Sequence, residues 1–381
     1  MVSDPAARPH VMRVYSRLEV GGIEKQMLRV LPRLNAGRYR ASLCLLKRPG
    51  ELADELRALG VAVHVLPFKG RLAPTSLLAL AKLFRAQGVS IVHAHVRESN
   101  TSATVAAKLA RVPVIIASIH NVDTMHGGRR LLQDRFLDRW RDAVVTVSDK
   151  VRDDYCAAVG IDPAKCVTIH NGLDLEAFTS GGRPRDAVRS ELGLAPADRA
   201  VITVARLVTQ KGHEVLLQAA ARVVAAVPGA RFLVAGEGHR LEELRAMAQS
   251  LGVGERVRFL GPRADVPDLD RASEVACLTS WREGFSNVVV ESLASGLPVV
   301  ATDVGGNREA VEEGVSGFLV PAGDAPAIAA RLIELLRDEP LRARMAEAAR
   351  RRAERFGIDE TVRKTEALYD RLLASKGVPV R

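Results

Sequence analysis

Long apolar segments are missing from this sequence of 381 residues. The longest apolar run covers about residues 112–119, well short of the roughly 18–20 residues that a helix needs to cross a bilayer. The first ten residues, MVSDPAARPH, contain no basic segment followed by an apolar core. We therefore expect neither a transmembrane helix nor a secretory signal.

Cysteine and aromatic residues are also scarce. The four cysteines form no C-x-x-C pair and no compact cluster with histidine: Cys44, Cys156, Cys166 and Cys277. This pattern predicts reduced thiols, no zinc site and a cytoplasmic location. Phe, Trp and Tyr make up only 4% of the residues, so the interleaved aromatics of nucleic-acid-binding surfaces are lacking and we expect no nucleic-acid partner.

Positive charge is unevenly distributed along the chain. The net charge is +10, and residues 1–180 contain 26 Lys and Arg against 17 Asp and Glu, a net of +9 that leaves +1 for the remainder. This asymmetry predicts that the first half meets an anion, such as a membrane surface or a phosphorylated acceptor. The alternative is a general bias of the composition toward arginine.

Short apolar strands alternate with amphipathic helices along the whole chain. The expected strands cover residues 11–15, 41–46, 61–66, 91–94, 114–118, 143–147 and 167–169, then 200–204, 231–235, 256–260, 275–278, 298–301 and 317–320. Such alternation predicts parallel sheets that are covered by helices on both faces.

Between the two series of strands, residues 180–186 are rich in glycine, proline and charge and form the best linker candidate. The length suits two domains of roughly 150–200 residues. We therefore predict an α/β fold with two doubly wound, Rossmann-like domains that face a central cleft, at residues 1–178 and 179–357. Ligands of such sheets bind at the carboxyl ends of the strands, so we expect the functional residues in the loops there.

The sharpest motif is the segment from Glu283 to Glu291, which follows the expected strand at residues 275–278. Ser286 or Asn287 can cap a helix that continues to Ala294, and the free N–H groups of its first turn suit a phosphate. Glu291 lies about one turn inside this helix, where a carboxylate can accept hydrogen bonds from a ribose diol. In isolation, both glutamates would be read as ordinary surface charges.

Two further loops of the second half accompany this motif. Arg206 and Lys211 lie in the loop after the strand at residues 200–204, where fixed cations can stabilise a departing diphosphate. Gly236 ends the next strand in a glycine turn that allows close backbone approach, although a G-x-G-x-x-G dinucleotide motif is absent. The Asp268-Leu-Asp270 string reads as charge at the start of a helix, and we predict no metal site.

Together these motifs resemble the retaining, metal-independent glycosyltransferases of family 4, which have the GT-B fold. The resemblance is dense over residues 200–324, which also contain Gly305-Gly-Asn-Arg-Glu309, and looser before them. The first half still has counterparts of the family's motifs in Gly21-Gly22, His93-Ala-His95, Ser118-Ile-His120-Asn121 and His170-Asn-Gly-Leu-Asp174. In the family, the last helix crosses back to the first domain, and the resemblance places residues 358–381 there.

The resemblance implies a role for each candidate residue. Glu291 would hold the ribose of a nucleotide sugar, Glu283 would contact hydroxyls of the transferred sugar, and Arg206 and Lys211 would stabilise the leaving diphosphate. His120 would face the sugar from the first domain, with one of His93 and His95 taken as a core residue. The backbone around the donor would come from Gly22, Gly236, Gly284, Phe285, Ser286 and Asn287.

The expected activity is therefore transfer of a sugar from a nucleoside-diphosphate donor to a hydroxyl of a glycan, glycolipid or lipid-linked acceptor. Surface polysaccharide or glycolipid biosynthesis is the expected setting, and the donor is a substrate, so no cofactor is expected. A sugar-nucleotide epimerase or hydrolase on the same fold is one alternative. A non-catalytic nucleotide-sugar-binding protein is another, which loss of Glu283, Arg206 or Lys211 would favour; all three are present.

Two segments, residues 69–85 and 129–141, combine leucines or aromatics with basic residues. Each could lie on an anionic bilayer with its apolar side chains inserted. The alternative is that both pack their apolar faces on the sheet. We expect peripheral contact of the first domain with an anionic membrane, on the inner face of the cell membrane.

Overall fold

A computed structural model describes residues 8–18, 21–36, 38–70, 72–121 and 128–379, apart from the side chains of Ala36 and Arg129. The chain forms two compact units. Unit 1 contains residues 1–172 together with the C-terminal residues 358–381, and unit 2 contains residues 173–357. Residues 173–178, which the sequence placed with the first domain, belong to unit 2.

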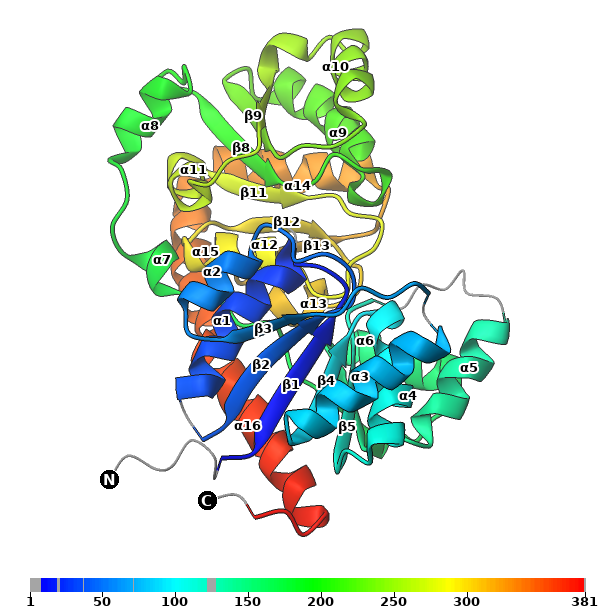
Figure 1. Cartoon of the computed structure of the whole chain (residues 1–381). Helices are drawn as coiled ribbons and strands as arrows, with labels where there is room; N and C mark the ends of the chain where they lie inside the picture. The colour runs from blue at the N-terminus through cyan, green and yellow to red at the C-terminus, as the bar shows by residue number, and fades with distance from the viewer. Residues whose placement is uncertain (1–7, 19–20, 37, 71, 122–127, 380–381) are drawn as a thin grey trace. The chain divides into compact units, whose positions relative to one another are not determined.

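Unit 1 is built on a parallel sheet of seven strands in the order β3-β2-β1-β4-β5-β6-β7 (Figure 1). Its strands are β1 His10–Tyr15, β2 Arg40–Leu45, β3 Ala62–Val65, β4 Val89–His95, β5 Val114–Ile119, β6 Ala143–Thr146 and β7 Cys166–Thr168. Its helices are α1 Gly22–Ala36, α2 Ala53–Ala58, α3 Pro74–Ala86, α4 Arg97–Ala110, α5 Gly128–Asp138, α6 Asp149–Val159 and α16 Ile358–Ser375.

Both faces of this sheet are covered because neighbouring strand residues point to opposite sides. Val11 and Tyr15 pack in one apolar cluster with residues of α1, α2 and α16. Met12 and Val14 pack in another with α3 and α4. The C-terminal helix α16 thus packs in the core of unit 1, where Tyr369 and Leu373 are fully buried. This arrangement confirms the return of the last helix to the first domain.

Unit 2 is built on a parallel sheet of six strands in the order β10-β9-β8-β11-β12-β13. Its strands are β8 Arg199–Val204, β9 Ala230–Ala235, β10 Val257–Gly261, β11 Val275–Leu278, β12 Val299–Thr302 and β13 Gly317–Val320. Its helices are α7 Glu176–Thr179, α8 Arg185–Glu191, α9 His213–Ala226, α10 Leu241–Ser250, α11 Val266–Ala272, α12 Asn287–Ala294, α13 Asn307–Ala310, α14 Ala325–Arg337 and α15 Glu339–Ala353. The two doubly wound parallel sheets confirm the predicted fold class.

The segment at residues 180–186 lies within unit 2 rather than between the units. The guanidinium of Arg183 donates to Asp265 (2.5 Å) and Asp268 (3.0 Å), which fixes the segment to α11. Residues from 185 onward form α8, whose Val188 is fully buried. The glycines and proline therefore mark turns on the surface of one unit.

Candidate functional site

The order of each sheet reverses at one position, and such switch points form ligand crevices at the carboxyl ends of the strands. In unit 2 the switch lies between the neighbouring strands β8 and β11. The loops that follow these strands are joined by hydrogen bonds. Trp281 N–H donates to the carbonyl of Gln210 (2.9 Å), and the Thr279 hydroxyl donates to the carbonyl of Gly212 (2.9 Å). The two motif-bearing loops are thus one structure.

Gly212 allows this close approach. Its φ of +63° is in the left-handed region, and a Cβ atom there would lie 2.1 Å from the carbonyl oxygen of Thr279. A side chain would therefore push the two loops apart. The glycine fixes where its neighbour Lys211 emerges, directly before α9.

Lys211 and Glu283 form an ion pair between the two loops. The Nζ of Lys211 lies 2.6 Å from Oε1 of Glu283, and the Ser280 hydroxyl donates to the same oxygen at 2.6 Å. The two charged side chains are only 17% and 8% exposed, so little water screens the pair. Sequence reasoning predicted both charged residues but missed their pairing and the contribution of Ser280.

The helix α12 begins directly beside this pair. Ser286 is its N-cap, and its hydroxyl accepts a hydrogen bond from Val289 N–H, which confirms the predicted cap. The ring of Phe285 is buried against Phe356, with 5.2 Å between the ring centroids. This packing anchors the backbone of residues 284–287 and aims the positive end of the helix dipole at the same carboxyl edge.

Three glycines, Gly236, Gly305 and Gly306, lie in close contact with the backbone of these loops. A Cβ on Gly305 would lie 1.8 Å from the carbonyl oxygen of Glu283, and Gly306 N–H donates to the carbonyl of Gly284 (2.9 Å). A Cβ on Gly236 would lie 2.0 Å from the carbonyl oxygen of Ala205. The close approach predicted for Gly236 is therefore one to the loop after β8.

Arg206 and Lys211 differ in exposure although they share a loop. Arg206 is exposed, whereas Lys211 is half-buried and held by Glu283. A half-buried, oriented cation interacts more strongly with an anion than a solvated one. The geometry therefore orients Lys211 more firmly than Arg206.

Asp268 lies in the first turn of α11, as the sequence predicted, whereas Asp270 is a buried acid rather than a charge at the start of the helix. Asp268 pairs with Arg183 and Arg271, but Asp270 is 1% exposed and its Oδ2 accepts a hydrogen bond from the Ser295 hydroxyl (3.2 Å). Burial and the negative charge of the nearby Glu291 raise the pKa of Asp270 to about 8. A buried acid therefore lies behind the carboxylate predicted to hold ribose.

The pH dependence of stability follows from this raised pKa. Asp270 contributes stability below its unfolded pKa, near 4, and loses it as pH rises toward 8, because folding then buries a charge. Asp270→Asn keeps the polar shape without the charge. We expect the variant to unfold at a higher temperature than wild type at pH 9, and the difference to shrink toward pH 5.

Thermal unfolding at pH 5, 7 and 9 measures this difference. Asp268→Asn is the matched control. Burial raises the pKa of Asp268, but hydrogen bonds from Arg183 and Arg271 outweigh it and lower the pKa, so loss of this carboxylate should destabilise the protein at neutral pH. Parallel pH profiles for wild type and Asp270→Asn would contradict the expectation.

In unit 1, His120 directly follows β5 at the carboxyl edge of the sheet. Its Nε2 lies 3.2 Å from Nδ1 of His95, and burial followed by the charge of Arg13 lowers the pKa of His120 to about 4. Both His93 and His95 are buried, at 2% and 4% exposure, where the sequence assigned only one to the core. Gly22 is the first residue of α1 rather than a residue of the preceding loop.

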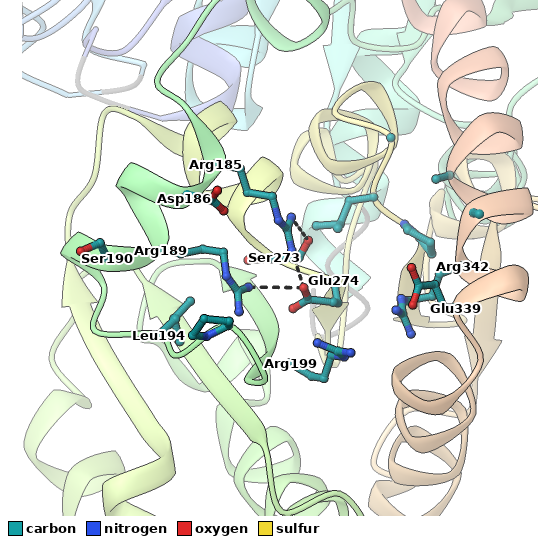
Figure 2. Close-up of a pocket in the computed structure, with 16 residues that line it drawn as sticks. Arg185, Asp186, Arg189, Ser190, Leu194, Arg199, Ser273, Glu274, Glu339 and Arg342 are labelled. Carbon is teal, nitrogen blue, oxygen red and sulfur yellow. Dashed lines mark hydrogen bonds and ion pairs between the residues drawn. The ribbon is translucent and has the colours of Figure 1, made fainter.

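A cavity of unit 2 lies elsewhere, at the amino ends of its strands (Figure 2). Its volume is about 900 Å³, and Arg199, Glu274 and Pro298 contribute to its lining. Glu274 pairs with Arg185 and Arg189, which come from α8. These ion pairs fasten α8 to the sheet, and the cavity takes no part in the site at the carboxyl edge.

Both halves of the sequence match known families. Residues 20–177 match the family described as Glycosyltransferase Family 4, and residues 184–352 match Glycosyl transferases group 1. The chain is 32% identical to D-inositol 3-phosphate glycosyltransferase of Corynebacterium urealyticum over 84% of this chain and 82% of the relative. The enzyme of that name from Mycobacterium marinum is also 32% identical, over 79% of this chain and 69% of the relative.

Solved structures give the same result. HepE of Anabaena, crystallised with UDP-glucose, has a TM-score of 0.84 at 25% identity and covers 95% of this chain and 99% of its own. The lipopolysaccharide galactosyltransferase WaaB has a TM-score of 0.76 at 16% identity, covers 95% of this chain and 99% of its own, and supports the fold alone. The two-sheet architecture and the paired loops thus define a glycosyltransferase of the GT-B fold. The chain belongs to glycosyltransferase family 4.

Among the residues that the structure describes, no helix is both long enough and apolar enough to span a membrane.

Proposed function

We propose that this protein is a retaining, metal-independent glycosyltransferase that moves a sugar from a UDP-sugar to a hydroxyl of a glycan, glycolipid or lipid-linked acceptor. The observation that carries the proposal is the Lys211–Glu283 pair beside the N-terminus of α12. This arrangement offers a half-buried cation and helix N–H groups to an anion, and a carboxylate to hydroxyls. The HepE complex with UDP-glucose supports the choice of nucleotide.

The mechanism follows from where charge develops. The transition state of glycosyl transfer resembles an oxocarbenium ion, and the leaving diphosphate gains negative charge. Lys211, Arg206 and the first turn of α12 would stabilise that charge in place of a divalent ion. Glu283 would accept hydrogen bonds from sugar hydroxyls, and Glu291 would accept them from the ribose. His120 would contact the transferred sugar.

A donor screen tests the proposal. Thermal shift and nucleotide release would be measured with UDP-, GDP-, ADP- and dTDP-sugars, with and without EDTA. We expect stabilisation by one UDP-sugar and release of UDP that persists in EDTA. Strict dependence on a divalent ion, or no response to any nucleotide sugar, would refute the proposal. The anomeric configuration of the product, read by proton NMR, tests retention.

The curated relatives suggest an alternative class of acceptor. Their name, D-inositol 3-phosphate glycosyltransferase, supports a small phosphorylated polyol, and the net +9 of residues 1–180 suits either a phosphate or an anionic membrane. A competition assay with inositol phosphate and a lipid-linked acceptor separates the two. A cytoplasmic location, expected from the free thiols, stays a prediction.

The surface of unit 1 favours one of the two segments proposed to meet a membrane. In α3, Leu77, Leu80 and Phe84 are buried, so this helix packs its apolar face on the sheet. In α5, Leu132 and Phe136 are 66% and 49% exposed. These residues lie one helical turn apart, the basic Arg135 lies on the same helix, and Arg139 directly follows its end. An exposed apolar stripe with basic residues suits the surface of an anionic bilayer.

We expect wild-type protein to co-sediment with phosphatidylglycerol vesicles at low salt, and more weakly at physiological salt because the charges are screened. Leu132→Glu/Phe136→Glu should abolish most of this binding. Val315→Glu, which changes an exposed apolar residue of unit 2, is the control and should bind as wild type. No sedimentation of wild type at low salt would favour a soluble acceptor.

A further inference from the structure

The sheet of unit 1 gathers imidazoles and an arginine on one face. His93 and His95 are two residues apart in β4 and so point to the same side. Arg13 of β1 is paired in register with His93, and Ser118 of β5 with His95. This face is the one that packs against α1 and α16. His120 follows Ser118 by two residues and continues the row at the carboxyl edge.

Contacts connect this row from α16 to His120. The ring of His93 lies with Nδ1 2.6 Å from the Tyr369 hydroxyl and Nε2 2.7 Å from the Ser118 hydroxyl. His95 stacks on His93, with 4.4 Å between ring centroids and 23° between planes. Nδ1 of His95 then lies 3.2 Å from Nε2 of His120. Each ring is thereby oriented by the one before it.

Charge and burial keep these imidazoles neutral. Desolvation, followed by the charge of Arg13, lowers the pKa of His93 and His120, and desolvation together with the neighbouring His93 and Arg13 lowers that of His95. Two neutral imidazoles that share one hydrogen bond need one donor and one acceptor. The tautomer of His95 therefore decides which role is left to the second nitrogen of His120.

The contact between His95 and His120 uses one ring nitrogen of each residue, which leaves one further nitrogen on each ring. His95 Nε2 and His120 Nδ1 are buried, and neither has a hydrogen-bond partner among the residues that the structure describes. An N–H on His95 Nε2 would be an unpaired donor in the core, where His95 is 4% exposed, whereas an N–H on His120 Nδ1 belongs to a half-buried residue at the carboxyl edge, where a ligand oxygen can pair with it. This places the proton of His95 on Nδ1, so that His120 Nε2 accepts and His120 Nδ1 carries a proton.

We propose that His95 is a positioning residue, held by His93 and by Tyr369 from the C-terminal helix, that fixes His120 as the Nδ1–H tautomer so that this N–H donates to an oxygen of the bound sugar substrate. The proposal rests on the proposed function of the site, in which His120 contacts the transferred sugar. In this proposal α16 does more than pack on the sheet, because its Tyr369 orients His93 through the hydrogen bond to Nδ1.

Kinetics of two His95 variants test this role. His95→Phe keeps a flat ring for stacking but removes the hydrogen bond, and we expect kcat to fall about 10- to 100-fold, the scale known for partners that orient a metal-ligating histidine. KM for the donor should change less than threefold. His95→Asn places an amide where Nδ1 was and should recover most of the loss. Tyr369→Phe should show the same effect in weaker form.

A matched control separates this effect from destabilisation. His10 is buried in the same sheet at the amino end of β1, with Nδ1 2.9 Å from the Gln87 carbonyl oxygen and Nε2 2.7 Å from the Ser42 hydroxyl. His10→Phe should lower the unfolding temperature but leave kcat per folded molecule unchanged. Wild-type kcat in folded His95→Phe would overturn the positioning role while the proposed function stands. Wild-type kcat in His120→Ala would instead remove His120 from the proposed site.

The tautomer itself is measurable. The protein would be labelled with ¹⁵N-histidine, and its imidazole NMR signals would be assigned with variants that replace one histidine at a time. We expect the signals of both His95 and His120 to show the Nδ1–H pattern at pH 7. His120 should change its tautomer distribution in His95→Phe and retain it in His10→Phe. The Nε2–H pattern for His120 in wild type would overturn the proposal.

Discussion

Lys211→Ala is expected to lower kcat by about 10²- to 10³-fold, or roughly 3–4 kcal/mol of barrier, with Arg206→Ala giving a smaller loss. Lys211 is half-buried and lies 2.6 Å from Glu283, so its charge is oriented before substrate binds. We expect such a preorganised cation to stabilise the leaving diphosphate more than the exposed Arg206 does. Steady-state kinetics with a saturating UDP-sugar measures both effects.

The Lys211 variant has a second effect that must be separated from the first. Without the cation, the 8% exposed carboxylate of Glu283 keeps the hydrogen bond from the Ser280 hydroxyl but loses its ion pair, and unpairing a buried charge costs about 3–5 kcal/mol of stability. Lys211→Met/Glu283→Gln removes both charges and should regain stability without regaining turnover. Arg245→Ala, on the exposed face of α10, is the control for removing one cation. Near-normal turnover in Lys211→Ala would refute its role.

We expect Glu291 to contribute mainly to UDP binding and Glu283 mainly to transfer of the sugar. Glu291→Gln should weaken UDP about 10- to 100-fold, because a hydrogen bond between a charged group and the ribose is worth about 1.5–3 kcal/mol. Glu283→Gln should leave the Kd of UDP within a few-fold and lower kcat at least 100-fold, since its carboxylate is assigned to the sugar. Calorimetry with UDP and single-turnover kinetics measure these two losses.

The ion pair sharpens this expectation. Loss of the Glu283 charge frees Lys211 to interact with the diphosphate, so UDP affinity should not fall and can rise. Glu313→Gln, an exposed glutamate near β13, is the control and should alter neither quantity. Equal loss of UDP affinity in Glu283→Gln and Glu291→Gln would show that the division of roles is wrong.

The sequence determined the fold class and the composition of the motif-bearing loops. Alternation of apolar strands with helices of 3.6-residue period is a local property, so two parallel doubly wound sheets could be predicted from it. The cap at Ser286 and the helix end at Ala294 were also predictable, because a capping hydroxyl satisfies N–H groups three residues away. The resemblance correctly placed the last helix with the first domain.

Only the tertiary structure decided which of these residues meet. The pairing of Lys211 with Glu283 joins residues 72 positions apart, and it depends on strand order, which places β8 beside β11. Asp270 was predicted as a charge at the start of a helix, yet packing of α11 against α12 buries it. His93, His95 and Tyr369 form one row because a sheet face and a helix 276 residues further along the chain are packed together. Local pattern fixes the direction of a side chain, but its partners are set by long-range packing.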